Sequence, residues 1–105
     1  MRLTAGKTEY DLPLDCSKVT QIYIRVDGRI LAIYELPQSI PQNQDMSHIT
    51  RGEAMRKEKY PKESIPVAYT VYPPKRRRKK QTIVFIPAPS KNWSVELNYY
   101  AIRTV

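Results

Sequence analysis

Cysteine, histidine and glycine are scarce in this chain. Its 105 residues include one cysteine, Cys16, one histidine, His48, and three glycines. A single cysteine excludes an intrachain disulfide framework. One cysteine and one histidine fall short of the four ligands of a structural zinc site, and three isolated glycines cannot form a phosphate-binding loop. We therefore expect Cys16 to be a small buried residue, and we predict no metal and no cofactor.

Long hydrophobic runs are absent as well. No apolar segment approaches the roughly 18 residues of a membrane span. The polar N-terminal segment, MRLTAGKTEYD, lacks the apolar region of a secretory signal. We expect a cytoplasmic origin and no membrane partner. Because hydrophobic residues make up 41% and charged residues 27% of the chain, we expect one globular domain over residues 1–105.

The abundant residues favour strands over helices. Nine prolines exclude a protein of long helices, and eight tyrosines, one tryptophan and one phenylalanine favour sheet. Alternating apolar and polar residues predict strands at 19–26, 29–36, 66–72, 81–86 and 93–101. Asp27-Gly28 predicts a tight hairpin between the first two, and we expect the third and fourth to form a second hairpin. The sequence predicts an all-β fold: a small antiparallel β-sandwich or partly open barrel of about five strands.

The segments before and between these strands are predicted to be irregular. We expect residues 1–11 to be a polar entry arm and residues 12–15 to be extended, because a residue that precedes proline avoids the helical region. In the strand at 93–101 we expect Trp93 and Ala101 to share the core face.

A long excursion, residues 37–64, separates the second and third predicted strands. Within it, Ser47 can cap a short helix that continues to about Lys59, although Gly52 is unfavourable inside a helix. Connections of this length are usually functional or flexible. We expect the excursion to pack on a neighbouring molecule. The candidate residues of a subunit interface are Ile49, Met55, Tyr60 and Tyr100.

Positive charge is concentrated in one short segment. The formal net charge is +8, and six adjacent cations supply six of these charges, which leaves 8 − 6 = +2 for the rest of the chain. The six cations are Lys75, Arg76, Arg77, Arg78, Lys79 and Lys80. We expect them in a solvated hairpin tip, residues 73–80. Three interpretations stay open: contact with nucleic-acid phosphates, contact with an acidic patch of a protein, or a tip that binds nothing in particular.

No pattern of acidic residues or potential nucleophiles indicates catalysis. The carboxylates are scattered, and His48 has no serine or cysteine placed near it on a sharp turn. We expect no catalytic residue and no enzymatic activity.

Several stretches of the chain resemble segments of a known family. Residues 3–16, LTAGKTEYDLPLDC, resemble an opening pattern aGxxxYdLPxD, and residues 19–31 resemble the hairpin that follows it. Later stretches resemble P-x-a-Y-t, i-x-f-x-P-a-P and v-e-L-x-Y-y at residues 66–70, 83–89 and 95–100. In this order, the motifs are similar to the β-rich domain of tailed-bacteriophage head-to-tail adaptor and tail-tube accessory proteins. They span most of the chain except the excursion.

The resemblance implies a structural virion protein, assembled in the host cytoplasm, without enzymatic activity. It implies a homo-oligomeric ring at the portal vertex or in the tail. It also implies that the partners are portal, adaptor or tail subunits, and that the basic loop makes a non-specific contact with DNA. A helical segment that docks on the portal usually precedes this domain in the family, and this chain starts at the β-domain. A separate tail or capsid accessory protein therefore fits the resemblance as well. The alternative function is a small nucleic-acid-binding β-barrel that uses the basic loop.

Overall fold

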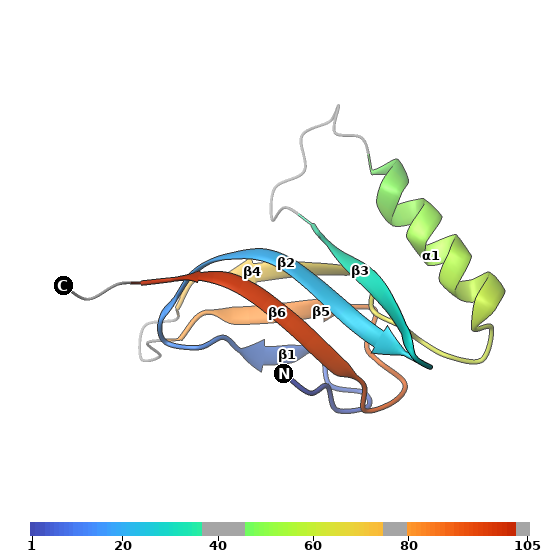
Figure 1. Ribbon diagram of the computed structural model, residues 1–105, viewed down its shortest axis with the longest axis horizontal. Coiled ribbons are helices and arrows are strands. Elements are labelled where there is room, and N and C mark those ends of the chain that lie inside the picture. The colour runs from blue at the N-terminus through green and yellow to red at the C-terminus, as the bar shows by residue number, and fades with distance from the viewer. Residues whose placement is uncertain (37–45, 75–79, 103–105) are drawn as a thin grey trace.

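The computed structural model describes residues 1–36, 46–74 and 80–102 (Figure 1). These residues form one helix and six strands. In chain order they are β1 (Glu9–Asp11), β2 (Cys16–Val26), β3 (Arg29–Glu35), α1 (Ser47–Lys59), β4 (Ala68–Tyr72), β5 (Thr82–Ile86) and β6 (Ser94–Ala101). The strands make one sheet in the order β1-β5-β4-β3-β2-β6, which curls into a half-barrel with β1 and β6 at its edges (Figure 1).

The β-rich class is confirmed, but the prediction that all strands run antiparallel is wrong. The sheet is mixed, because β3 and β4 run parallel. The described residues contain six strands where about five were predicted, and they form one curled half-barrel, which corresponds to the partly open barrel of the prediction and not to the sandwich. The parallel pair follows from the excursion, because a crossover that contains a helix lets the chain re-enter the sheet in the same direction.

The hairpin of β2 and β3 confirms the prediction from Asp27-Gly28. Both turn residues have positive φ, 50° at Asp27 and 78° at Gly28, as a type I′ turn requires. Ile24 and Val26 point into the core, whereas Arg25 between them is exposed. β4 and β5 also pair antiparallel as predicted. The connection between β4 and β5 includes residues 75–79, which lie outside the described residues.

The first residues contribute more than a polar arm. Leu3 and Leu12 are buried in the core, and residues 9–11 form the edge strand β1. The backbone N–H of Leu3 donates to the carbonyl of Trp93 at 2.8 Å, so the N-terminal residues cover the start of β6. β1 was not predicted because three residues are too few to show an alternating pattern.

Two further local predictions are wrong. Leu14 and Asp15 form a turn instead of continuing an extended segment, and the N–H of Cys16 donates across it to the carbonyl of Pro13 at 3.0 Å. Trp93 is buried as predicted, but Ala101 is exposed. Ala101 pairs with Cys16 at the end of β6, beyond the buried part of that strand.

The core fills the concave side of the curled sheet. Its most buried members include Ile24 from β2 and Ile83 and Phe85 from β5, with Val95 from β6 packed in the same cluster. Cys16 belongs to this cluster, which confirms the prediction of a small buried residue. Burial, together with the nearby Asp15, raises the pKa of its thiol.

The helix of the excursion is present and ends at Lys59, as the sequence predicts, and it begins at Ser47. Ser47 is nevertheless its first residue and not its cap. Met46 occupies the cap position and makes no side-chain capping hydrogen bond. The helix lies at the side of the half-barrel next to β3 (Figure 1), and Arg56 is its one buried residue among those described.

Candidate functional site

One side of α1 meets the sheet through residues spaced four apart. His48, Gly52, Arg56 and Tyr60 follow this spacing, which places them on one face of a helix. The ring of His48 lies edge-on to Tyr34 with centroids 5.0 Å apart. The Arg56 Nη2 atom donates to the carbonyl of Ala32 on β3 at 2.5 Å. These contacts attach the helix to β3 at two places: Arg56 bonds to Ala32, which β4 does not pair with, and His48 contacts Tyr34, which pairs with Ala68 of β4.

Gly52 allows the close approach of this face. A Cβ atom built there would lie 3.0 Å from a methyl carbon of Val67 and 3.0 Å from an Nη atom of Arg56. Nearly all larger side chains would therefore push α1 away from the sheet. The glycine that is unfavourable for helix formation is the residue that lets the helix pack.

Arg56 is a buried cation with incomplete hydrogen bonding. The residue is 9% exposed, and its Nε atom has no hydrogen-bond partner among the residues that the structure describes. Burial lowers the pKa of the guanidinium, and the nearby Tyr34 opposes that shift. Among the described residues, the two ion pairs join Lys57 to Glu53 and Lys91 to Glu63, so neither places a carboxylate on Arg56. A buried charge in this state is costly until an anion compensates it.

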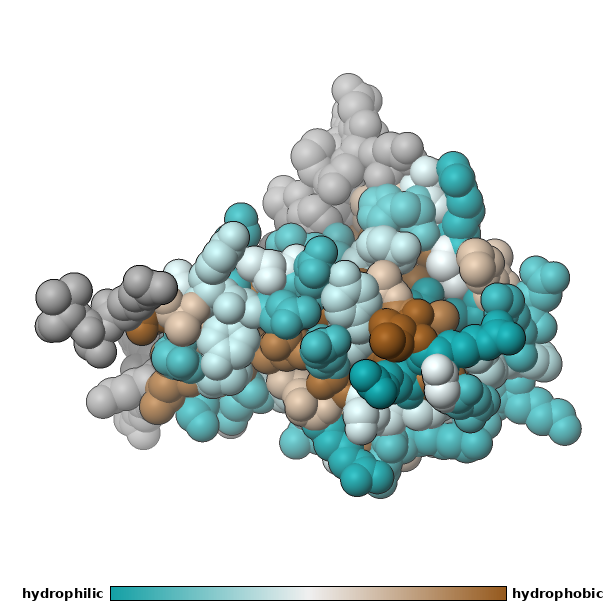
Figure 2. Space-filling model, viewed as in Figure 1, coloured by the Kyte–Doolittle hydropathy of each residue, from teal (hydrophilic) through white to brown (hydrophobic). Residues whose placement is uncertain are grey.

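A groove of about 150 Å³ lies between α1 and β3 beside this arginine. We call it the α1–β3 groove. Its lining residues are Ile30, Leu31, Ala32, Tyr34, Gly52, Met55, Arg56, Lys59 and Tyr60. Its walls are mainly apolar, and two of its lining residues, Arg56 and Lys59, are cations. Figure 2 shows hydrophobic atoms gathered near the end of the β2–β3 hairpin, on a face that is otherwise largely hydrophilic.

The structure brings together only two of the four predicted interface residues. Met55 and Tyr60 line the α1–β3 groove. Ile49 is half-buried on the same helix but is not part of the lining, and Tyr100 is exposed on β6. Sequence reasoning missed Arg56, because an arginine on a polar helix normally faces solvent. The spacing of Gly52, Arg56 and Tyr60 is the signal that would have indicated a packed face.

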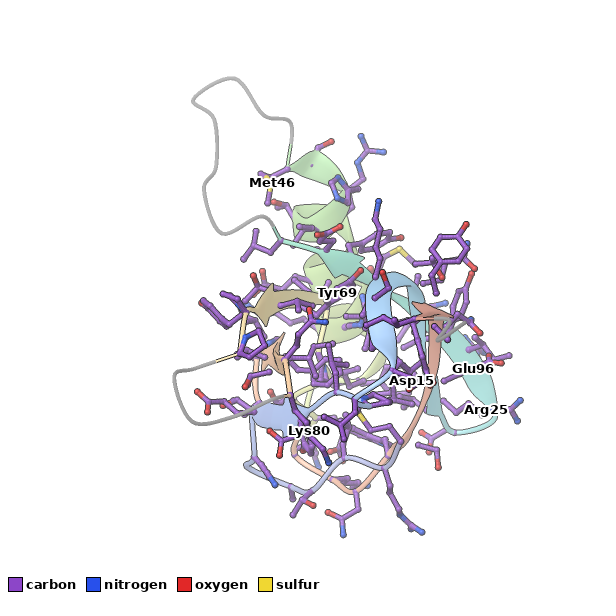
Figure 3. The ribbon with its side chains drawn as sticks, turned by 90° about the vertical axis from the view of Figure 1, so that its left-hand side faces the viewer. Asp15, Arg25, Met46, Tyr69, Lys80 and Glu96 are labelled. Carbon is purple, nitrogen blue, oxygen red and sulfur yellow. The ribbon has the colours of Figure 1, made fainter. Side chains whose placement is uncertain are left out.

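A second, larger groove of about 730 Å³ lies near the two edges of the half-barrel. We call it the seam groove. Its charged lining residues are Asp11, Arg25, Lys80 and Glu96. Figure 3 shows Lys80 on the side of β1 and β5, with Arg25 and Glu96 on the side of β2 and β6. Both signs of charge line this groove, so its walls do not form a uniformly basic channel.

Lys80 is the one member of the basic run that the structure describes. It is exposed and lines the seam groove. The other five predicted contact residues, Lys75, Arg76, Arg77, Arg78 and Lys79, lie outside the described residues.

Two carboxylates, those of Glu63 and Asp15, accept hydrogen bonds from other side chains and connect surface segments. Glu63 accepts a hydrogen bond from the Ser90 hydroxyl at 2.6 Å and pairs with Lys91 at 3.0 Å. These contacts lower the pKa of Glu63, in the order Ser90 and then Lys91. Asp15 accepts a hydrogen bond from the Tyr99 hydroxyl at 3.2 Å. The Glu63 contacts join two loops, and the Asp15 contact joins a turn to β6, so these two carboxylates do not converge on one cleft.

Residues 1–36, 46–74 and 80–102 contain neither a group of potential metal ligands nor a helix that could span a membrane. No cluster of three or more potential metal ligands occurs there. No described helix has the length and hydrophobicity needed to cross a membrane.

No family model, curated protein or solved structure matches this chain. The resemblance to phage adaptor and tail accessory proteins therefore rests on the sequence motifs alone. The two grooves and the exposed apolar side chains are features of the structure and do not depend on that resemblance.

Proposed function

We propose that this protein is a structural component of a tailed-phage particle that acts by packing against other protein subunits. It would serve as a head-to-tail connector, a tail protein or a capsid accessory protein, assembled in the host cytoplasm and without enzymatic activity. The sequence motifs support the assignment to a tailed-phage particle. The exposed apolar surface supports packing as the mode of action.

One observation carries the packing argument. Five large apolar side chains among the described residues are more than half exposed: Leu14, Ile30, Met55, Tyr100 and Ile102. Isolated exposed apolar residues are ordinary on a monomer, but grouped ones mark contact surfaces. Ile30 and Met55 belong to one groove. Leu14 and Ile102 flank Asp15, whose carbonyl accepts the N–H of Ile102 at 2.6 Å.

The edges of the half-barrel offer a second contact surface. The N-terminal residues cover the start of β6, where the N–H of Val95 donates to the carbonyl of Met1 at 2.8 Å. Open strand edges invite pairing with another chain unless they are covered. In an assembled particle, a neighbouring subunit would cover the continuation of β6.

The test is mass spectrometry of purified phage particles from the host of this gene. The proposal predicts that the protein is present at a fixed copy number after density-gradient purification. A protein that is expressed during infection but absent from purified particles would contradict it.

A nucleic-acid-binding barrel is the second candidate, and one observation favours it. Lys80 lines the seam groove together with Arg25 and is continuous in sequence with five further cations. If six phosphates are neutralised, the log–log dependence of affinity on salt has a slope of about −5. Binding to a DNA duplex at several salt concentrations, compared with a variant in which all six cations are glutamine, tests this function. Equal and weak binding by both proteins would eliminate it.

A further inference from the structure

The α1–β3 groove is suited to an occupant that presents an apolar side chain beside a carboxylate. Ile30 and Met55 are 57% and 53% exposed at its rim. Arg56 is buried there without a carboxylate among the described residues, and Lys59 adds an exposed cation. A carboxylate placed against these two cations would compensate the buried charge and form charge-assisted hydrogen bonds.

The chain itself contains a segment with this chemistry. Leu14 is 60% exposed and is followed directly by the exposed Asp15. We call these two residues the acidic turn. Three hydrogen bonds hold its shape: Cys16 N–H to Pro13 carbonyl, Ile102 N–H to Asp15 carbonyl, and Tyr99 hydroxyl to the Asp15 carboxylate. Little conformational freedom is therefore lost when the turn binds.

The acidic turn and the α1–β3 groove lie at opposite ends of the molecule. The connection between β1 and β2 lies beside the C-terminal end of the described chain, whereas α1 lies at the far end (Figure 1). One copy therefore cannot place its own turn in its own groove. Contact between two different surfaces is heterologous, and its repetition produces a ring or an open chain of subunits.

We propose that copies of this protein associate head to tail, with the acidic turn of one copy seated in the α1–β3 groove of the next. Leu14 packs between Ile30 and Met55, and the Asp15 carboxylate lies against Arg56 and Lys59. This inference rests on the proposed function, because it names the surface through which a packing subunit contacts its neighbour. It specifies a second copy, because the chain supplies both the acidic apolar segment and the basic apolar groove.

Sedimentation velocity of blocked variants tests the contact. The turn-blocked variant is Leu14→Asp, and the groove-blocked variant combines Met55→Asp with Lys59→Glu. All three positions are exposed, so the fold should tolerate the changes, and circular dichroism melting verifies this. Lys62→Glu is the control for the Lys59→Glu component, because it makes that same charge change at an exposed residue outside the groove.

The expected result has three parts. Each blocked variant sediments as a monomer at concentrations where the wild type and the Lys62→Glu control associate. An equimolar mixture of the two blocked variants forms a dimer that grows no further. Such a dimer forms because the intact groove of the Leu14→Asp copy binds the intact turn of its partner.

A charge exchange tests the ionic part separately. Asp15→Lys and Lys59→Glu should each weaken association about tenfold, and the double variant should recover much of the loss. In the double variant every copy again presents opposite charges at the two surfaces. Failure of the double variant to exceed the single variants would overturn the pairing of Asp15 with Lys59.

Other outcomes would overturn the whole contact. If the blocked variants associate as strongly as the wild type, the copies pack through a different face, and the proposed function survives. If the mixture of blocked variants stays monomeric, the contact is not head to tail. If the wild type is monomeric at every concentration, copies do not associate in this way, and the proposed function then depends on the analysis of purified particles.

Discussion

Tyr69 shows how the core of this small protein controls the ionisation of a side chain. It lies on β4, is 3% exposed, and belongs to the core cluster. Burial raises the pKa of its phenol to about 12, and the charge of Glu35 adds to this effect. The folded state therefore holds the proton that the unfolded chain releases near pH 10.

This shift predicts a loss of stability at alkaline pH. The contribution of Tyr69 is present in full below pH 10 and is lost as the pH rises toward about 12. We expect the loss at pH 11.5, relative to pH 9, to be about 1–2 kcal/mol smaller in Tyr69→Phe than in the wild type. Urea unfolding at both pH values measures the difference. Tyr100→Phe, at an exposed position, is the control, and equal alkaline losses in the wild type and Tyr69→Phe would contradict the assignment.

Arg56 illustrates a residue whose role the sequence does not reveal. It stands among Met55, Lys57 and Glu58 in a polar helix, and such a residue normally points to solvent. Its burial results from the path of the excursion, which lays α1 beside β3 so that Arg56 reaches the carbonyl of Ala32. That path depends on contacts between residues far apart in the chain, so periodicity along α1 cannot predict it.

At the scale of elements, the features that depend on local sequence patterns were predicted better than the pairing of strands that are far apart in the chain. The β2–β3 hairpin and the extent of α1 follow from alternation, turn chemistry and helix propensity, which act between near neighbours. The parallel pairing of β3 with β4 depends on where the crossover delivers the chain. The prediction of an extended segment failed at the acidic turn. It rested on the preference of the residue before Pro13, and that preference does not determine the conformation of the residues that follow the proline.

The attachment of α1 gives a prediction at this scale. An isolated polar helix of 13 residues is marginal in water, so contact with the sheet must hold it. Gly52→Leu should loosen that contact, because its Cβ atom meets Val67 and Arg56 at 3.0 Å. We expect a destabilisation of about 1–3 kcal/mol and faster hydrogen exchange of the α1 amides.

Ala54→Leu is the matched control for this change. Ala54 is exposed on the same helix, so the added side chain meets solvent, and its effect on stability should be small. If both leucine variants exchange their α1 amides at the wild-type rate, the close packing at Gly52 is not what holds the helix.

At the scale of the whole molecule, the half-barrel combines a well-packed core with two unlike ends. One end presents the acidic turn with Ile102, and the other presents the α1–β3 groove with its two cations. The open edges of the sheet and the exposed apolar residues add contact area. A neighbouring subunit would bury this surface and supply the carboxylate that Arg56 lacks among the described residues.

The molar mass in solution tests the central claim most directly. Size-exclusion chromatography with light scattering would be run over a range of concentrations, alone and with the neighbouring proteins of the particle. We predict a mass above the 12.3 kDa of one chain, from self-association or from a stable complex. A mass of 12.3 kDa at every concentration, with no co-elution with any particle protein, would contradict the claim that this protein works by packing against other subunits.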